Sequence, residues 1–473
     1  MLRHLFFILF LPFSVLSQMP STAIKNVNIV DVEKGVVKRN QTVVIEDGKI
    51  KAIGTNTAIP KNAVQINGKG KYLMPGLWDM HFHMWDIIKD GWEINEKVSL
   101  PLFLANGITG VRYMYGNSGL LDLRNRINAG TTQGPRLIIS SPILKGTPSK
   151  VTAMYHIKDT THARSSIDSI AALGYDLVKI YTCWPDRAVF FAVAEACRRN
   201  QLPFAGHVPA TVTAAEAIEA GMSSIEHLHG IREAYASNEA ELVRFNADVC
   251  ITRRSLFNAL DSITSQMVRF FDQRQGDKLA RLLKAKNAFA TPTQFFHNYL
   301  EIAGKMDSVA YADNIYNRYT PSSLKATLLK ELIPPSQAPI IAKAQKKENA
   351  YARKVILHLY RQGVPLLVGT DGPNIGLVPG FSVHQEMETL VNIGVSNKAV
   401  LQAATINPAR NLGLDKRLGS VLTGKEADLL LLDGNPLQDI KNTRKINAVI
   451  VRGKLLSRKE LDDILQAVEL QCK

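Results

Sequence analysis

The 473-residue chain carries 57 basic and 42 acidic side chains, giving a net charge of +15, and 46% of its residues are hydrophobic. This composition excludes a disordered chain, a collagen and a disulfide-dense miniprotein, and a mean hydropathy near zero excludes a polytopic membrane protein. The length accommodates about three ordinary domains, or one large barrel with a small domain. Because the basic residues are spread along the chain, with no aromatic and basic nucleic-acid module, we expect no nucleic-acid partner.

The first 18 residues predict a signal peptide. Arg3 supplies a basic start, and the uncharged apolar segment 5–16 is followed by Ser17 and Gln18. Twelve residues are too few for a transmembrane helix, which needs roughly 20, so we expect cleavage and export without a stable membrane span. The protein is thus predicted to be secreted or periplasmic. Export allows a disulfide, but four scattered cysteines do not predict one: Cys183, Cys197, Cys250 and Cys472.

Both ends of the chain have the sequence pattern of short strands joined by tight turns. Near the N-terminus, two apolar segments flank Asp47-Gly48, a dipeptide that suits the positive φ values of a hairpin turn. Apolar runs return at 427–433 and 448–455, and residues 457–470 have the spacing of a short amphipathic helix. We therefore predict a small β-sandwich domain formed by both termini, made of residues 19–73 and 412–473.

The middle of the chain alternates short apolar runs with helical stretches, as repeated βα units do. One run at 176–181 is followed by a helix, a run ending at His207, another helix and a run ending at His227; a later run ends at Asp371. Metal-capable side chains at successive strand ends are expected on the C-terminal rim of a (β/α)8 barrel. We predict an α/β fold with a TIM-like barrel over residues 74–411; the alternative is an open doubly wound sheet with chance histidines.

The first predicted barrel strand ends in an H-x-H motif. Alternate residues of a strand point to the same side, so His81 and His83 can face one ion. The motif alone is weak, since histidines also serve as hydrogen-bonded core residues. Spacing strengthens it: at about 31 residues per βα unit, Lys179, His207 and His227 fall on strands four, five and six.

The distance between His227 and Asp371 predicts insertions. These residues are 144 positions apart, whereas two βα units need only about 62. The polar helical stretches 239–284 and 298–353 are the expected insertions, and residues 288–293 are the expected seventh strand.

Lys179 is anomalous within its apolar run. A buried lysine is rare without a partner, and burial lowers its pKa. A neutral amine adds carbon dioxide to form a carbamate, an anionic oxygen ligand able to bridge two metals. The alternative is a snorkelling or ion-paired strand lysine, but the company of four histidines and an aspartate favours the carbamate.

The chain resembles the amidohydrolase superfamily. It is most similar to the imidazolonepropionase-like and prolidase-like branch, whose members have a binuclear metal site and a carboxylated lysine. The resemblance covers roughly residues 22–456 and is much more specific for the superfamily than for the substrate. It rests on the residues above and on these motifs: Pro75-Gly-Leu-Trp-Asp-Met-His81, Ala205-Gly-His-Val-Pro209, Ser224-Ile-Glu-His-Leu228, Gly369-Thr-Asp-Gly372, Ala404-Thr-Ile-Asn-Pro408 and Gly424-Lys-Glu-Ala-Asp-Leu429.

The resemblance implies two divalent metal ions and a role for each ligand. The implied ligands are His81, His83 and Asp371 for the more buried ion, His207 and His227 for the second ion, and carboxylated Lys179 between them. These donors suit Zn²⁺ above all, with Mn²⁺, Co²⁺ or Fe²⁺ as other occupants. A hydroxide bridging the two ions would attack the substrate carbonyl, and Asp371 would carry its proton to the departing nitrogen.

The resulting prediction is a metal-dependent amidohydrolase that cleaves a carbon–nitrogen bond in a small molecule or short peptide, with a dipeptidase or prolidase-like activity as one form. The alternatives are a lactone or ester hydrolase, a deaminase, and a catalytically inactive binding protein; Lys179 argues against a mononuclear deaminase. Loop 142–150 lacks the Gly-Gly-His that prolidase-like relatives often carry, which weighs against dipeptide specificity. A homo-oligomer is compatible with the sequence. Further candidates for substrate contact are Tyr113, Tyr115, His156, Tyr181 and His229, whereas His384 is expected to pack or cap.

Overall fold

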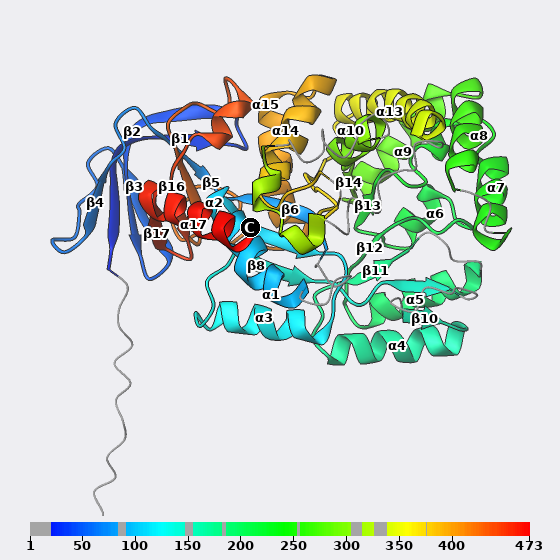
Figure 1. Ribbon diagram of the computed structural model, residues 1–473, viewed down its shortest axis with the longest axis horizontal. Coiled ribbons are helices and arrows are strands. Elements are labelled where there is room, and N and C mark those ends of the chain that lie inside the picture. Colours follow the sequence, from blue (N-terminus) through cyan, green and yellow to red (C-terminus); the bar gives the residue numbers. More distant parts are fainter. Residues whose placement is uncertain are drawn as a thin grey trace, which may run out of the picture.

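The structure, a computed structural model, describes residues 20–83, 91–146, 155–181, 186–252, 256–303, 315–325, 338–374 and 376–473. The predicted signal peptide and Cys183 lie outside these residues. Within them, the chain has an α/β fold in two parts: a sheet built from both chain ends, and parallel strands surrounded by helices (Figure 1). Across the described residues, every helix is too short or too polar to cross a membrane.

The two chain ends share one sheet. Among the described residues, eight strands form it in the order β17-β16-β15-β5-β1-β2-β3, with β4 paired to β1. A β-sandwich is not confirmed, because hydrogen bonds connect all of these strands into a single sheet. The strands are β1 (Thr22–Asp31), β2 (Val36–Glu46), β3 (Lys49–Gly54), β4 (Val64–Asn67), β5 (Tyr72–Pro75), β15 (Leu429–Leu432), β16 (Ile446–Val451) and β17 (Lys454–Ser457).

Tight turns fix the register of this terminal sheet. The predicted hairpin at Asp47-Gly48 is confirmed: it joins β2 to β3, with φ values of 47° and 73°. Arg452 and Gly453, with φ values of 49° and 80°, join β16 to β17 in the same way. Two consecutive residues at positive φ give the turn whose twist matches that of the strands it joins.

Strand β15 explains how the sheet attaches to the rest of the molecule. It consists of four buried leucines, and successive side chains of a strand point to opposite faces. Leu429 and Leu431 pack in the apolar cluster of the terminal sheet, whereas Leu430 and Leu432 pack in the large cluster of the parallel strands and their helices. The sheet is therefore buried on both faces at this strand.

The parallel strands form two sheets in the described residues. The first has the order β6-β7-β8 and the second the order β10-β9-β11-β12-β13-β14. They are β6 (Leu77–Phe82), β7 (Ile108–Tyr113), β8 (Arg136–Ile139), β9 (Leu144–Gly146), β10 (Tyr155–Ile157), β11 (Val178–Ile180), β12 (Phe204–Gly206), β13 (Ser224–Glu226) and β14 (Phe289–Thr291). The predicted seventh strand thus corresponds to β14.

A closed eight-stranded barrel is not confirmed. Residues 364–371, the predicted eighth strand, do not form a regular strand. The sheets are instead linked by isolated parallel bridges, namely Ser140 with Leu177, Ala290 with Leu366, and Phe82 with Gly372. The backbone of Met80 also donates to the Val368 carbonyl at 3.0 Å, so the segment lies beside β6 without regular pairing.

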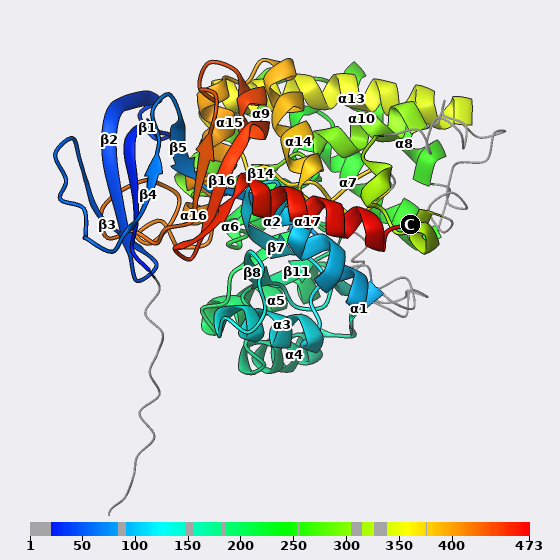
Figure 2. The same cartoon turned by 60° about the vertical axis from the view of Figure 1, so that its left-hand side comes forward.

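Helices surround the parallel strands (Figures 1 and 2). Side-chain caps start several of them: Asp186 accepts from the first turn of α5, and Thr213 with Glu216 forms a capping box on α6. The predicted insertion at 239–284 contains α7, α8 and α9, and that at 298–353 contains the end of α10 and most of α13. The helices are α1 (Gly91–Ile94), α2 (Leu100–Ala105), α3 (Ser118–Asn128), α4 (Thr160–Ala172), α5 (Arg187–Arg199), α6 (Ala214–Glu219), α7 (Glu239–Thr252), α8 (Leu256–Arg269), α9 (Gln273–Ala285), α10 (Gln294–Ala303), α13 (Ala338–Arg361), α14 (Phe381–Ile393), α15 (Asn397–Ala403), α16 (Ile406–Asn411) and α17 (Arg458–Gln471).

Gly76 connects the terminal sheet to the parallel strands. It separates β5, which pairs with β15, from β6, which begins the parallel strands and carries His81. A Cβ at this position would lie 2.1 Å from the Thr109 hydroxyl, so only glycine lets the chain pass here. Strand β5 runs two residues beyond the predicted domain boundary at residue 73.

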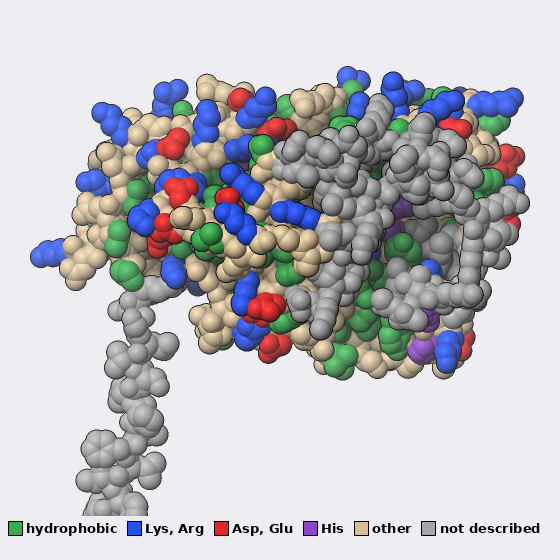
Figure 3. Space-filling view, in the orientation of Figure 1, with side chains coloured by type: hydrophobic (Ala, Val, Ile, Leu, Met, Phe, Trp, Pro, Cys, Tyr) green, Lys and Arg blue, Asp and Glu red, His purple; other side chains and the backbone are tan. Residues whose placement is uncertain are grey.

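The described basic side chains do not form a single stripe on the face drawn in Figure 3. Lys and Arg side chains are scattered over the terminal sheet and the helices there, with Asp and Glu between them.

Candidate metal centre

The six predicted ligands lie at the carboxyl ends of the parallel strands and of the neighbouring 364–370 segment. Loops at this end of parallel strands are where α/β proteins build their sites. His81 lies in β6 and His83 follows it, Lys179 lies in β11, His207 follows β12, His227 follows β13, and Asp371 follows residues 364–370.

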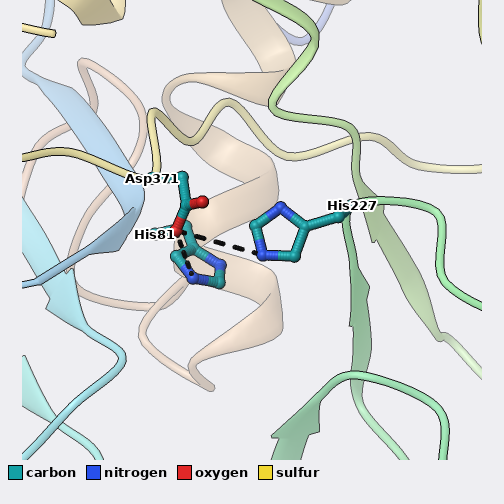
Figure 4. A group of neighbouring side chains, drawn as sticks. All are labelled: His81, His227 and Asp371. Carbon is teal, nitrogen blue, oxygen red and sulfur yellow. Dashed lines mark ion pairs between the residues drawn. The ribbon is translucent and has the colours of Figure 1, made fainter. Parts of the chain in front are cut away.

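The Asp371 carboxylate is the centre of this group (Figure 4). Its Oδ1 lies 3.2 Å from His81 Nε2, 3.0 Å from His83 Nε2 and 4.0 Å from His227 Nε2. The two Nε2 atoms of the H-x-H motif are 3.2 Å apart. Although burial acts to raise it, the histidines hold the pKa of Asp371 well below its usual range, so the group is a carboxylate.

A buried ion pair orients His81. Its Nδ1 lies 2.8 Å from Glu226 Oε2, and the other oxygen of Glu226 accepts from Arg112 at 2.8 Å. Burial acts to raise the pKa of Glu226, but Arg112 and His81 hold it well below its usual range. A carboxylate only accepts hydrogen bonds, so His81 donates to Glu226 through Nδ1–H, and Nε2 is the ring nitrogen directed toward Asp371.

Thr293 orients His227 by the same logic. The Thr293 hydroxyl donates to the Pro292 carbonyl at 2.7 Å and lies 2.7 Å from His227 Nδ1. Since its proton is used, the hydroxyl accepts from His227 Nδ1–H, and Nε2 is the ring nitrogen directed toward Asp371. Thus two imidazoles from different strands are held in the tautomer that binds a cation through Nε2.

Lys179 is fully buried beside this group. Its Nζ is 3.4 Å from His81 Nε2, and 1% of the residue is exposed. Burial lowers the pKa of Lys179 to about 8, despite the opposing effect of Glu226 and Asp371. A substantial fraction of the amine is therefore neutral near physiological pH.

His207 joins the group through ring contacts. Its ring centroid is 4.9 Å from that of His227, 4.5 Å from that of His229 and 4.8 Å from that of Tyr181. Burial lowers the pKa of both His207 and His227 well below the usual value, so both rings are neutral. Tyr181 and His229, two predicted substrate contacts, thus line the side of the group formed by His207.

Strained backbone supports the site. His227, Thr293 and Asp371 have φ values of 57°, 50° and 62°, a region that non-glycine residues rarely occupy. Such strain persists only where surrounding structure fixes it. Asp79 provides this for the residue before Asp371, because it accepts from both the backbone and the hydroxyl of Thr370 at 3.1 and 2.6 Å.

Sequence reasoning missed Glu226, Arg112 and Thr293. Arg112 and Glu226 are charged residues inside apolar strands, the same signal that singled out Lys179, so two further anomalies were available. Thr293 has no comparable signal, because its role depends on a positive φ.

Two other predicted residues belong to the core. The hydroxyl of Tyr113 donates to Asn95 at 2.9 Å, and the residue is completely buried. His384 packs as expected: its ring nitrogens lie 2.9 Å from the Thr443 hydroxyl and 3.0 Å from the Asn106 carbonyl.

The donor set fits a metal ion. Among the described residues, one ligand atom from each of His81, His227 and Asp371 lies within 4.8 Å of the others. Two imidazole lone pairs and a carboxylate that converge on one point are stabilised by a shared cation. The individual ligand roles of all six residues stay predictions.

Replacing Glu226 by Gln is expected to weaken the affinity for Zn²⁺ by about 10–100-fold, the usual effect of losing a partner that orients a ligand. The neutral amide no longer fixes the His81 tautomer. Competition with a chromophoric chelator measures the affinity, and circular dichroism reports the fold. Glu195→Gln, which changes an exposed carboxylate paired with Arg164, is the control; equal affinities of the two variants would refute the role of Glu226.

Comparison with known proteins gives a consistent set of relatives. A family model described as "Amidohydrolase family" matches residues 72–456. The chain is 22% identical over 436 residues to an imidazolonepropionase of Alkaliphilus oremlandii, covering 89% of this chain and 90% of that protein. It is 22% identical over 484 residues to a 5-methylthioadenosine/S-adenosylhomocysteine deaminase of Caldanaerobacter subterraneus subsp. tengcongensis, covering 92% and 93%.

Local and structural matches agree with this. An imidazolonepropionase of Thermoplasma acidophilum is 30% identical over 126 residues, although the match spans 28% of that protein and 25% of this chain. A solved Xaa-Pro dipeptidase with bound methionine superposes with a TM-score of 0.67 at 20% identity, covering 92% of this chain and 100% of that chain. At that identity the likeness shows a shared fold.

Proposed function

Since the chain belongs to the amidohydrolase family, we propose that it uses two divalent metal ions to cleave an amide bond in a peptide, an N-acyl amino acid or a cyclic amide. The chain has the α/β fold of this family and is a hydrolase that acts on carbon–nitrogen bonds. The substrate class and the number of ions are the proposed parts.

The observation that carries the proposal is the convergence on Asp371. Three histidine Nε2 atoms surround one carboxylate oxygen at 3.0–4.0 Å. Glu226 and Thr293 fix the tautomers of His81 and His227 from behind, so the donors are oriented before any ion binds. Such preorganisation is expected of a metal centre and not of ordinary core histidines.

We assign the ligands as the sequence predicts. His81, His83 and Asp371 would hold the first ion, His207 and His227 the second, and Lys179, once carboxylated, would bridge them. When bound, divalent ions lower the pKa of water and polarise a substrate carbonyl; imidazole and carboxylate donors favour Zn²⁺.

Carboxylation of Lys179 needs a neutral amine. In this step the Nζ lone pair forms a bond to the carbon of CO₂, one C=O π pair moves onto oxygen, and Nζ gives one proton to water, which leaves a carbamate with one negative charge. The depressed pKa of Lys179 supports this step. The carboxylated Lys179 would no longer carry a positive charge. The neighbouring guanidinium of Arg112 is paired with Glu226.

Asp371 is the proposed proton carrier. Its carboxylate would accept a proton from the attacking water and donate it to the departing nitrogen, so that the leaving group departs as a neutral amine. Its low pKa keeps it deprotonated, and Thr370, fixed by Asp79, holds the adjacent backbone.

A screen of dipeptides, N-acyl amino acids, lactones and hydantoin-like rings on metal-replete protein tests the proposal. We expect about two metal ions per chain and hydrolysis of an amide class that stops when a chelator removes the metal and resumes when Zn²⁺ is restored. Ammonia detection distinguishes a deaminase, which the similarity to a deaminase keeps as the second candidate. Protein that purifies without stoichiometric metal and cleaves no amide would be a binding protein, contrary to the proposal.

We also propose that the parallel strands close as a (β/α)8 barrel in which the irregular segment 364–371 takes the place of the eighth strand. The bridges from Ala290 to Leu366 and from Phe82 to Gly372 support this closure, because they place the segment between β14 and β6. The separate apolar cluster of the terminal sheet supports a small β domain formed by residues 19–73 and 412–473.

We further propose that residues 1–18 direct export to the periplasm or the outside of the cell. The basic Arg3 and the uncharged segment 5–16 support this. N-terminal sequencing of the protein recovered from the exported fraction is expected to begin near residue 19; retention of Met1 in the cytoplasm would refute export.

A further inference from the structure

His297 lies beside the candidate metal centre on a helix that the mechanism above does not use. It is on α10, one turn after Thr293, and its backbone N–H donates to the Thr293 carbonyl at 3.4 Å. Thr293 itself lies before α10 with a positive φ, so the position of the His297 ring is given by its contact: its centroid lies 6.2 Å from that of His227.

Both ring nitrogens of His297 are buried without a hydrogen-bond partner among the described residues. Two other buried histidines outside the centre are fully partnered. His358 contacts the Tyr235 hydroxyl at 2.8 Å and Asp277 at 3.0 Å, and His384 contacts Thr443 and Asn106. An unpaired buried donor or acceptor is costly and rare, so this one requires a reason.

The charges around His297 keep it neutral and favour an electron-rich partner. Burial, together with the positive charge of Arg232, lowers its pKa to about 4, and Asp371 opposes the shift. The negative charge of Asp371, the proposed proton carrier, therefore acts on the His297 ring. Arg232 is paired with the buried Glu348, so it holds its charge close to the ring. A neutral imidazole offers one N–H donor and one acceptor.

We propose that His297 is a substrate-binding residue, whose N–H donates a hydrogen bond to a carbonyl or carboxylate oxygen of the amide substrate held at the centre. The inference rests on the proposed function and assigns a residue to its substrate. A partner supplied by the substrate explains why the nitrogens are unpaired within the protein and why the ring stands next to His227.

Substitution by leucine tests the proposal in two independent ways. His297→Leu removes two unpaired polar atoms, so the melting temperature is expected to stay unchanged or rise by about 1–3 °C. The same variant is expected to raise the KM for the amide substrate found in the screen on the order of 10-fold, with a smaller change in kcat. His297→Gln or His297→Asn, which restore an N–H at different positions, are expected to recover part of this loss.

His358→Leu is the matched control, because it removes a largely buried histidine whose two ring nitrogens have partners outside the centre, Tyr235 and Asp277. We expect it to lower the melting temperature by about 2 °C or more, since Tyr235 and Asp277 lose their partner, and to leave KM unchanged. Metal content is measured on every variant, so that an effect on the centre is separated from an effect on the substrate.

The outcomes separate this inference from the proposed function. A melting temperature of His297→Leu that falls as in His358→Leu would show that a buried water or another internal partner satisfies the ring, which overturns the inference. An unchanged KM would overturn it as well, while hydrolysis by the wild type leaves the proposed function intact. If the wild type hydrolyses no amide, the proposed function fails and the inference fails with it.

Discussion

Replacing Asp371 by Asn is expected to lower kcat by about 10²–10⁴-fold, the range attributed to a positioned proton carrier. The amide cannot accept the proton of the attacking water, and the neighbouring Glu226 carboxylate already accepts from His81 Nδ1 and Arg112. KM is expected to change much less, because substrate binding does not depend on this proton. Steady-state kinetics on metal-replete protein, with metal content measured in parallel, checks this.

The design separates a lost proton carrier from a lost ligand. If the metal content of Asp371→Asn falls together with kcat, kinetics at saturating Zn²⁺ isolate the chemical step. Asp168→Asn, which alters an exposed carboxylate paired with Arg199, is the control and should retain wild-type turnover. Near-wild-type turnover of Asp371→Asn would remove Asp371 from the mechanism.

Replacing Lys179 by Ala is expected to abolish most activity, by about 10²-fold or more, together with one of the two metal ions. The substitution deletes the proposed bridging carbamate and leaves a cavity at the end of β11. A short carboxylic acid such as acetate is expected to enter this cavity and partly restore both the metal and the rate. Metal analysis and kinetics with and without acetate measure the effect.

Lys425→Ala is the matched control for Lys179→Ala. Lys425 is also largely buried, but its ammonium donates to the Asp415 and Leu418 carbonyls and to Ser420, away from the centre. Its loss should reduce stability without altering metal content, and acetate should change nothing. Unchanged metal content and rate in Lys179→Ala would refute the bridge.

The sequence predicted the candidate metal ligands better than the residues that orient them. His81, His207 and His227 could be predicted because the last residues of parallel strands lie at one edge of the sheet, and because the spacing of βα units can be counted along the chain. Glu226 and Thr293 act through partners that are distant in sequence, His81 and His227, and no local pattern reports such pairs. The positive φ of Thr293 depends on tertiary packing, which a β-branched residue gives no hint of.

Turns and helices were predicted well where contacts within a few residues stabilise them. The Asp47-Gly48 turn and the capping residues of α6 and α17 encode their own structure, since each satisfies backbone groups within a few residues. Residues 364–371 were expected to be a regular strand from their apolar composition. Pro365 cannot donate to a ladder, and the positive φ of Asp371 ends the extended backbone, so only isolated bridges form.

The pairing of β5 with β15 has a consequence for the order in which the protein acquires its structure. Lys71 and Asp433, 362 positions apart, form an ion pair across this junction. During synthesis, β5 can pair with β1 but must wait for its other neighbour, β15, until almost the whole polypeptide has left the ribosome. Closing so long a loop is slow, and an unpaired strand edge invites misassembly in the interval. In the nascent chain, the edge of β5 that later pairs with β15 therefore stays unpaired until the C-terminal strands emerge.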